Sequence, residues 1–264
     1  MQKSTNWQLF KDYLSFWWQS GNAHTLHSPF MYNLATKCFY DKTKYTDYQK
    51  LKAYQKALSQ NNEIITVNDL GAGSRKLSSK QRKISDISNI AGSSFSDMKQ
   101  LYRLSKYFAP KNILELGTSL GKSAFSLALG NLSANVITVE GDKNLRNLAK
   151  HHFKQFQQQN VQVINQDFDD YLTNLNKTNQ QFDMIILDGN HRYQPTLVYF
   201  EKLQKHIHND TVVVVDDIYW SAEMKNAWFA LKTHPCVRQS VDTYHFGILF
   251  FRKEQFKEDF TIRL

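Results

Sequence analysis

Three aspartates and one histidine stand where alternating strands and helices would place catalytic groups. Asp188 follows a short apolar run and begins an Asp-Gly-Asn-His stretch that ends at His191. Asp216 and Asp217 come at the end of the next apolar run. Open α/β sheets bind their ligands at the edge where the carboxyl ends of parallel strands meet. The four residues therefore predict a polar site at that edge.

The residue types indicate which chemistry this site can perform. Carboxylates gathered at one edge repel each other unless they are protonated or bind a cation. Their oxygen atoms suit Mg²⁺ or a similar hard ion, so Asp188, Asp216 and Asp217 are predicted metal ligands. The alternative is that Asp188 or Asp217 caps a helix. His191 can accept a hydroxyl proton near neutral pH, especially from a hydroxyl that a metal has acidified, or it is only a polar group at the mouth of the site.

A second stretch with chemical potential covers residues 112–123, Asn-Ile-Leu-Glu-Leu-Gly-Thr-Ser-Leu-Gly-Lys-Ser. An apolar run meets Gly117 and Gly121, and apolar residues at helical spacing follow. This strand, glycine turn and helix are typical of a nucleotide-binding crossover, although a tight turn without a ligand is the alternative. The next apolar run ends in Glu140, about 20 residues beyond Gly121, where such folds place an acid that accepts hydrogen bonds from ribose hydroxyls.

The elements that must position these residues alternate regularly from residue 93 onward. Strands are predicted at 113–116, 136–139, 161–164, 184–187 and 211–215, and helices near 121–130, 142–157, 168–176, 194–207 and 221–232. The last two apolar runs, 237–241 and 246–251, have no helix between them and predict an antiparallel hairpin. The chain is therefore predicted to be an α/β protein with a doubly wound, mostly parallel seven-stranded sheet that ends in this hairpin.

Residues 1–92 are predicted to form a mainly helical extension, and residues 93–264 the Rossmann-like domain. Helices are expected near 7–18, from Pro29 with Ser28 as its cap, and near 45–58. A second nucleotide-binding loop is an alternative interpretation of the predicted strand at 64–67 and the glycines of the Asp69–Ser74 stretch. We do not favour it, because the residues up to Lys83 are polar and basic and form no apolar helix. We therefore expect residues 69–83 to be a mobile loop near the site, which forms a lid over the substrate face together with the N-terminal helices.

Composition excludes several classes of protein. The 264 residues are 41% hydrophobic, which is enough for a sizeable core. No apolar run approaches the roughly 18 residues of a membrane span. We find no signal peptide, and two cysteines, Cys38 and Cys236, indicate neither a disulfide framework nor a zinc site. We expect a cytoplasmic protein without a membrane span.

The charge leaves two kinds of partner open. The formal net charge is +9, and basic residues concentrate only at 75–76 and 80–83. Such a charge permits nucleic acid or a small anionic ligand. We favour a small-molecule substrate, with RNA binding or RNA modification as the alternative. The oligomeric state is not predictable from these features.

The predicted sheet and its terminal hairpin resemble the class I S-adenosylmethionine-dependent methyltransferases over about residues 93–264. The run from Glu115 to Ser123 is similar to the Glu-x-Gly-x-x-x-Gly-x-Ser motif of the O-methyltransferase branch. The resemblance implies that the cofactor is held by Glu115, Gly117, Thr118, Ser119, Gly121, Ser123, Glu140, Asp167 and Asp188. Within this set Glu140 matches the ribose acid, and Asp167 follows Gln166 where the family holds the adenine amino group. Nicotinamide enzymes have Gly-x-Gly-x-x-Gly at this turn, whereas Ser119 and Lys122 occupy those glycine positions here.

The acidic residues resemble those of metal-dependent O-methyltransferases, including the catechol type and a sugar-modifying type with Asp-Gly-x-His-x-Tyr. In those enzymes the equivalent acids hold Mg²⁺, which binds two hydroxyl oxygens of the substrate. Two features depart from the catechol type, which has Asp-Asn where this chain has Asp216-Asp217, and lysine where it has His191. The resemblance implies methyl transfer to a hydroxyl of a small molecule with divalent-metal assistance, and His191 and Asp188 as catalytic residues.

Overall fold

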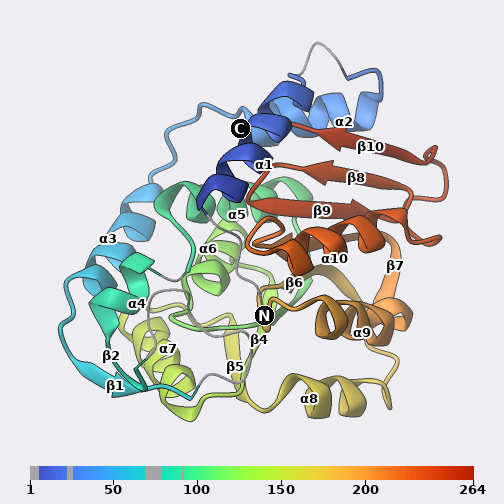
Figure 1. Ribbon diagram of the computed structural model, residues 1–264. Helices are drawn as coiled ribbons and strands as arrows, with labels where there is room; N and C mark the ends of the chain where they lie inside the picture. Colours follow the sequence, from blue (N-terminus) through green and yellow to red (C-terminus); the bar gives the residue numbers. More distant parts are fainter. Residues whose placement is uncertain (1–5, 23–25, 69–78, 91) are drawn as a thin grey trace. The chain divides into compact units, whose positions relative to one another are not determined.

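The computed structural model describes residues 6–22, 26–68, 79–90 and 92–264 (Figure 1). These residues belong to two compact units, of which the first comprises Met1–Tyr40 and Leu172–Leu264 and the second Asp41–Tyr171. The predicted division between residues 92 and 93 lies inside the second unit and stays a prediction. The glycines of the alternative nucleotide-binding loop, at 69–74, lie outside the described residues.

Three parallel strands form the centre of the second unit. They are β3 (Asn112–Leu116), β4 (Asn135–Glu140) and β5 (Val161–Asn165), with β4 paired to both neighbours. Helices α5 (Phe95–Phe108), α6 (Lys122–Gly130) and α7 (Lys143–Gln155) flank these strands in the chain. Apolar residues on both faces of β3 and β4 are fully buried, which is why these strands appear in the sequence as continuous apolar runs. The predicted strands and helices of this region are confirmed.

The remaining elements of the second unit are α3 (Tyr48–Ser59), β1 (Ile64–Thr66), β2 (Gln81–Lys83) and α4 (Ile84–Ile90). The expectation of a loop up to Lys83 was wrong for residues 81–83, because β2 pairs antiparallel with β1. Its side chains are polar, and only the middle residue, Arg82, is buried, so no apolar run indicates the strand. α5 begins with a capping box, since Ser94 accepts the Asp97 N–H and the Asp97 carboxylate accepts the Ser94 N–H.

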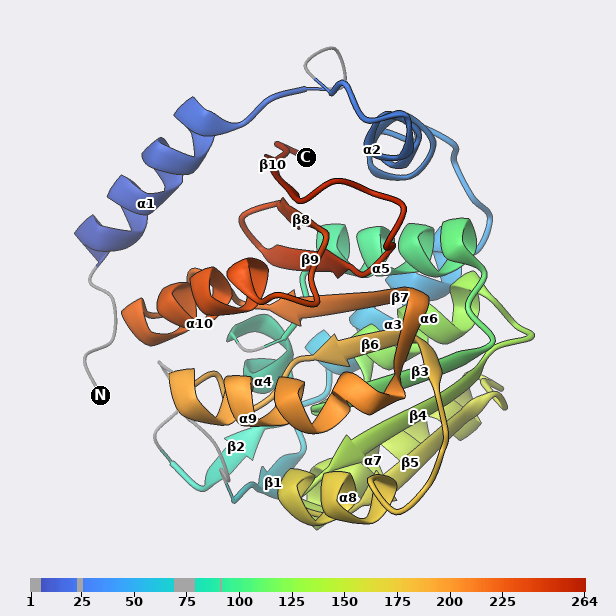
Figure 2. The same ribbon diagram turned by 90° about the vertical axis from the view of Figure 1, so that its right-hand side faces the viewer.

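The first unit carries five strands in the order β10-β8-β9-β7-β6 (Figure 2). They are β6 (Phe182–Leu187), β7 (Ile207–Asp216), β8 (Gln239–Asp242), β9 (Phe246–Phe250) and β10 (Glu258–Thr261). β6 and β7 are parallel, whereas β9 runs antiparallel to both β7 and β8. The helices α9 (Tyr193–Leu203) and α10 (Ala222–Thr233) follow β6 and β7, and α8 (Phe168–Leu175) precedes β6. The predicted mostly parallel α/β fold with a terminal antiparallel hairpin is confirmed.

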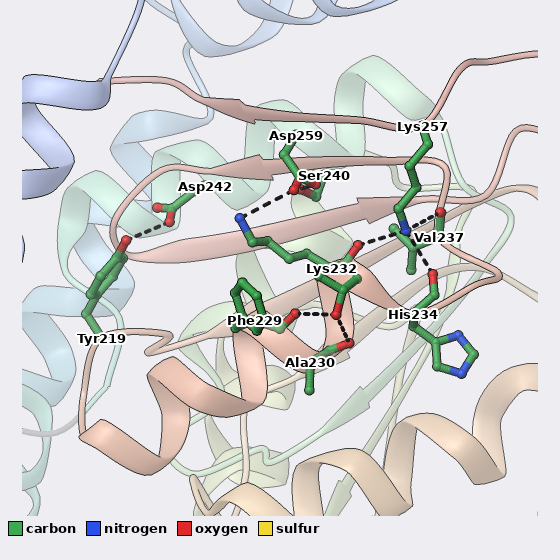
Figure 3. A network of polar contacts seen from close by, with 11 residues as sticks. Tyr219, Phe229, Ala230, Lys232, His234, Val237, Ser240, Asp242, Lys257 and Asp259 are labelled. Carbon is green, nitrogen blue, oxygen red and sulfur yellow. Dashed lines mark hydrogen bonds and ion pairs between the residues drawn. The ribbon is translucent and has the colours of Figure 1, made fainter.

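β10 is one strand more than the seven that we predicted. It pairs in parallel with β8, yet only Phe260 of its four residues is buried. Polar contacts hold the strand and its neighbours (Figure 3). The Ser240 hydroxyl donates to Asp259 at 2.6 Å, and Lys232 forms an ion pair with the same carboxylate. Because Ser240 and Lys232 lie outside β10, the four residues of the strand give no sign of these contacts, and the strand was not predicted.

The N-terminal part of the first unit is helical, as predicted. It contains α1 (Asn6–Gln19) and α2 (Pro29–Leu34), which continues as a π-helical turn, η2 (Ala35–Phe39). Ser28 caps α2 by accepting the Met31 N–H. No helix in the described part of the chain is both long enough and apolar enough to cross a membrane.

Candidate functional site

The predicted glycine turn joins β3 to α6. Gly117 and Gly121 adopt φ angles of 111° and 75°, a region that glycine enters at little cost. The Gly117 N–H donates to the Val139 carbonyl of β4 at 3.0 Å. A Cβ on Gly121 would lie 2.5 Å from Phe153 Cζ and 2.9 Å from the Tyr54 hydroxyl oxygen. Gly121 is therefore required both by the backbone and by the packing around it.

Helix α6 begins directly after the glycine turn. Its N-cap residue is Gly121, and no side chain of the described residues caps the helix there. The first N–H groups of a helix lack partners within the helix and attract negatively polarised groups. The donor set at this turn fits a nucleotide-like cofactor.

Glu140 ends β4 and is held by the glycine turn. The Ser119 N–H donates to Oε2 at 2.9 Å, and the Asp142 N–H donates to Oε1 at 2.8 Å. Burial raises the pKa of Glu140, although these backbone hydrogen bonds oppose the rise. Each carboxylate oxygen can accept more than one hydrogen bond, so both can still accept a ribose hydroxyl. The predicted ribose acid is thus fixed in place before any ligand binds.

Glu115 lies beneath the turn and is fully buried. It accepts a hydrogen bond from the Thr138 hydroxyl, which is 2.6 Å from the Thr118 hydroxyl. Burial raises the pKa of Glu115 to about 7, and hydrogen bonds from Ser123 and Thr138 oppose this rise. Three predicted cofactor residues, Glu115, Thr118 and Ser123, therefore meet in one buried network below the glycine turn.

Asp167 lies at the same edge of the second unit, after β5. β5 pairs in parallel with β4, with Asn165 opposite Glu140. Asp167 is exposed, and its Oδ1 atom accepts the Asp169 N–H at 2.8 Å. The structure thus brings the seven other predicted cofactor residues of this unit and Asp167 to the carboxyl ends of β3, β4 and β5.

Two residues that sequence reasoning did not select support this edge. Asp142 caps α7 and also accepts the Asn68 N–H at 2.9 Å, so it holds the segment after β1. Lys122 is buried and donates from Nζ to the Ser88 carbonyl at 2.6 Å and the Ser93 carbonyl at 3.3 Å. Burial lowers the pKa of Lys122 to about 8. Both contacts depend on distant residues, so the motif itself gives no signal of them.

In the first unit, Asp188, His191 and Asp217 interact. His191 Nε2 lies 3.6 Å from Asp188 Oδ1, and the two side chains are 21% and 18% exposed. Burial lowers the pKa of His191, while the Asp217 carboxylate opposes this change. The ring of Trp220 lies 5.9 Å from that of His191. A neutral imidazole beside two acids can accept a proton and have the resulting charge stabilised.

The backbone of this region is unusual. Asn190, His191 and Asp217 adopt φ angles of 68°, 39° and 55°. Non-glycine residues enter this region at a cost of the order of 1–3 kcal/mol each, and such residues cluster at functional sites. The loops after β6 and β7 therefore combine titratable groups with backbone strain.

The predicted metal ligands do not form a ready metal site. Asp216 ends β7, and its Oδ1 atom accepts the Asp217 N–H at 2.9 Å. Among residues 6–22, 26–68, 79–90 and 92–264, no three His, Cys, Asp or Glu side chains gather as they would around a metal ion. Metal binding by Asp188, Asp216 and Asp217 stays a prediction.

A cavity of about 520 Å³ in the first unit lies away from these loops. Its lining includes Ile207, His208 and Arg238. Ile207 begins β7 and Asp216 ends it nine residues later, a separation of about 30 Å at roughly 3.3 Å per residue. The cavity therefore does not belong to the predicted catalytic residues.

Comparisons with known proteins find similarity to methyltransferases. A family model described as a methyltransferase domain matches residues 114–218. No curated protein matches the chain. The match begins in β3 and ends just after Asp217, so it includes both the glycine turn and the acid–histidine loops.

Solved structures share the fold at low sequence identity. An SAH-bound methyltransferase of Podospora anserina is 14% identical with a TM-score of 0.60, over 86% of this chain and 97% of that chain. An O-methyltransferase of Bacillus cereus in complex with SAH is 19% identical with a TM-score of 0.56, over 83% of this chain and 99% of that chain. The O-methyltransferase TomG of Streptomyces achromogenes, in complex with SAM, is 21% identical with a TM-score of 0.53, over 62% of this chain and 82% of that chain. The predicted resemblance to class I S-adenosylmethionine-dependent methyltransferases is confirmed.

Proposed function

We propose that this chain, which carries a methyltransferase domain of the class I fold, transfers a methyl group from S-adenosylmethionine to a hydroxyl of a small molecule. The observation that carries the proposal is the geometry of Glu140. This acid stands at the carboxyl end of β4 and is fixed by the Ser119 N–H of the glycine turn, with capacity to accept ribose hydroxyls. The similar structures from Bacillus cereus and Streptomyces achromogenes are O-methyltransferases in complex with SAH and with SAM, which supports both the cofactor and the hydroxyl acceptor.

The cofactor residues have separate roles in this proposal. Glu140 accepts hydrogen bonds from the ribose, and Asp167, one strand further, accepts one from the adenine amino group. Gly117 and Gly121 let the cofactor approach the backbone, and the uncapped N-terminus of α6 supplies N–H groups. Glu115, Thr118 and Ser123 hold the turn from below. When bound, S-adenosylmethionine supplies a methyl group attached to a positively charged sulfur.

His191 is the proton acceptor in the proposed reaction. Its lowered pKa keeps the imidazole neutral at neutral pH, as a base must be. In this reaction the substrate oxygen would form a bond to the methyl carbon as the bond between that carbon and the cofactor sulfur breaks, so that S-adenosylhomocysteine leaves and the hydroxyl proton passes to His191. The Asp188 carboxylate, 3.6 Å from Nε2, then stabilises the positive imidazolium. Asp217 adds to this stabilisation through its charge.

The divalent cation remains a prediction that would add to this chemistry. Asp188 follows β6 and Asp216 ends β7, which is its parallel neighbour. Proton transfer is assigned to His191, and a cation held by the three aspartates would lower the pKa of the substrate hydroxyl. The cytoplasmic location and the lid formed by the N-terminal residues likewise stay predictions.

RNA as the substrate is the alternative. One basic residue that suggested it, Arg82, is only 8% exposed and donates from Nε to the Ser79 carbonyl. A buried arginine cannot contribute to a phosphate-binding surface. This observation favours the small-molecule substrate.

The test is a turnover assay of the full chain with S-adenosylmethionine. Pools of diols, catechols and sugars are offered, with RNA in a separate reaction, and release of S-adenosylhomocysteine is measured with Mg²⁺ and with excess chelator. We expect release with a hydroxyl-bearing small molecule. His191→Gln should lower the rate about 10²-fold, the lower range for general base catalysis.

The matched control is His208→Gln, which removes another histidine of the first unit that is paired with an aspartate, at 3.2 Å from Asp183. This variant should keep the wild-type rate. Release with RNA alone would contradict the proposal. Full activity in excess chelator would exclude the cation from the proposed mechanism. An unchanged rate in His191→Gln would exclude His191 as the base.

A further inference from the structure

Helix α1 turns an apolar face away from the unit to which it belongs. Five residues at helical spacing are strongly exposed: Trp7 (64%), Phe10 (52%), Leu14 (48%), Trp17 (47%) and Trp18 (84%). At about 100° per residue they fall within one arc of roughly 100°. We call these five residues the outer face. An amphipathic helix normally buries such a face, so the outer face indicates a partner.

The opposite face of α1 already makes the contacts that hold the helix in the first unit. Asp12 is buried and forms an ion pair with Lys225 of α10 at 2.6 Å. Phe16 is buried and packs against Tyr244, whose hydroxyl donates to the Leu9 carbonyl. Because the inner contacts occupy a separate side of the helix, they leave the outer face uncovered.

Cations border the outer face. Lys11 lies over the Trp7 ring at 5.3 Å, and the Arg263 guanidinium lies over the Trp17 ring at 5.1 Å. The acid of the described helix, Asp12, is buried on the inner side. The outer face is therefore aromatic with positive charge at its margin.

We propose that the outer face of α1 binds the protein to the surface of an anionic lipid bilayer. Tryptophan favours the membrane–water interface, where its ring is apolar and its N–H stays hydrated. Lys11 and Arg263 would meet lipid phosphates, and the chain's net charge of +9 adds long-range attraction. A helix of 14 residues, about 21 Å long, lies flat on such a surface and does not cross it. A second copy of the chain is disfavoured, because its own Lys11 and Arg263 would border the same face.

The experiment is co-sedimentation of the full chain with vesicles. One set contains phosphatidylcholine alone. In the other, about one lipid in three is the anionic lipid phosphatidylglycerol. We expect binding to the anionic vesicles that is at least tenfold stronger than to the neutral ones, since each cation contributes about fivefold. Raising the salt concentration should weaken this binding.

Two variants separate the outer face from general stickiness. The double variant Trp17→Ser, Trp18→Ser should weaken vesicle binding more than tenfold. Phe256→Ser removes an aromatic side chain that is 88% exposed outside α1, and it should bind as the wild type does. Circular dichroism confirms that each variant is folded.

Three results would overturn the inference. They are absence of binding to anionic vesicles, equal loss of binding in the Phe256→Ser control, and a wild-type dimer in sedimentation that the double tryptophan variant converts to monomer. The last result would assign the outer face to a second copy of the chain.

Discussion

The carboxyl ends of β3 to β5 and the loops after β6 and β7 hold their acids in different ways. In the first region, Glu140 accepts two backbone N–H groups and Glu115 lies in a fully buried hydroxyl network. In the second, Asp216 accepts one backbone N–H, from Asp217, while His191 and Asp188 lie 3.6 Å apart and remain about one-fifth exposed. Backbone contacts fix a ligand site in advance, whereas side-chain contacts can rearrange around a substrate.

The two regions also differ in how many non-glycine residues adopt positive φ angles. Around the cofactor turn, Gly117 and Gly121 adopt them at little cost, and Ser119 is the non-glycine residue that does so, with a φ of 46°. In the other region Asn190, His191 and Asp217 adopt them without being glycine. Strain of this kind persists where function requires it. We infer that the cofactor side is rigid and that the acid–histidine side adapts to the substrate.

The largest expected effect comes from breaking the rigid side. Gly121→Val should lower the free energy of unfolding by roughly 2–5 kcal/mol, because a non-glycine residue at φ 75° is strained and its side chain would collide with Phe153. Cofactor binding should be lost. The control, Gly92→Ala, has a φ of 110° but no atom within 4 Å of the new Cβ, so it measures backbone strain alone. Equal denaturation midpoints for the two variants would contradict the close packing.

The next effect tests the buried acid of the rigid side. The pKa of Glu115 is about 7 in the folded chain, above its ordinary value of 4.5. Between these pH values the unfolded chain releases the proton while the folded chain keeps it. The free energy of unfolding therefore falls by about 3 kcal/mol as the pH rises through this range. In Glu115→Gln the free energy of unfolding should no longer show this decrease. Urea denaturation at pH 4.5, 6 and 8 measures it. Parallel pH curves for wild type and variant would place the Glu115 pKa near its ordinary value.

The smallest effect belongs to the adaptable side. The Asp217 carboxylate raises the pKa of His191 against the effect of burial, so Asp217→Asn should lower this pKa further. A base with a lower pKa stays neutral in more acidic solution, and the acid limb of the pH–rate profile should move to lower pH. The rate at neutral pH should change less than tenfold. Nuclear magnetic resonance titration of His191 checks the same shift directly, and an upward shift would contradict the proposed contact.

The sequence was most informative where local pattern determines structure. The apolar run, the two glycines and the acid after the next strand predicted β3, α6 and Glu140, because burial and turn geometry act within a few residues. Ser28 was predicted as a helix cap for the same reason.

Prediction failed where distant residues decide the outcome. β2 and β10 are short polar strands whose partners lie elsewhere in the chain. Lys122 showed no sign that it would donate to the carbonyls of Ser88 and Ser93. Binding of a cation by Asp188, Asp216 and Asp217 stays a prediction, because it depends on side-chain orientation, which spacing does not determine.

Calorimetric titration of S-adenosylmethionine into the wild type and Glu140→Ala tests the central proposal most directly. The wild type should bind, and the variant should bind roughly 10- to 100-fold more weakly, because hydrogen bonds to a charged acceptor contribute about 1.5–3 kcal/mol. Thermal unfolding of the unliganded variant provides the folding control. Absence of binding to the wild type, or unchanged affinity in the folded variant, would contradict the assignment of the cofactor to this site.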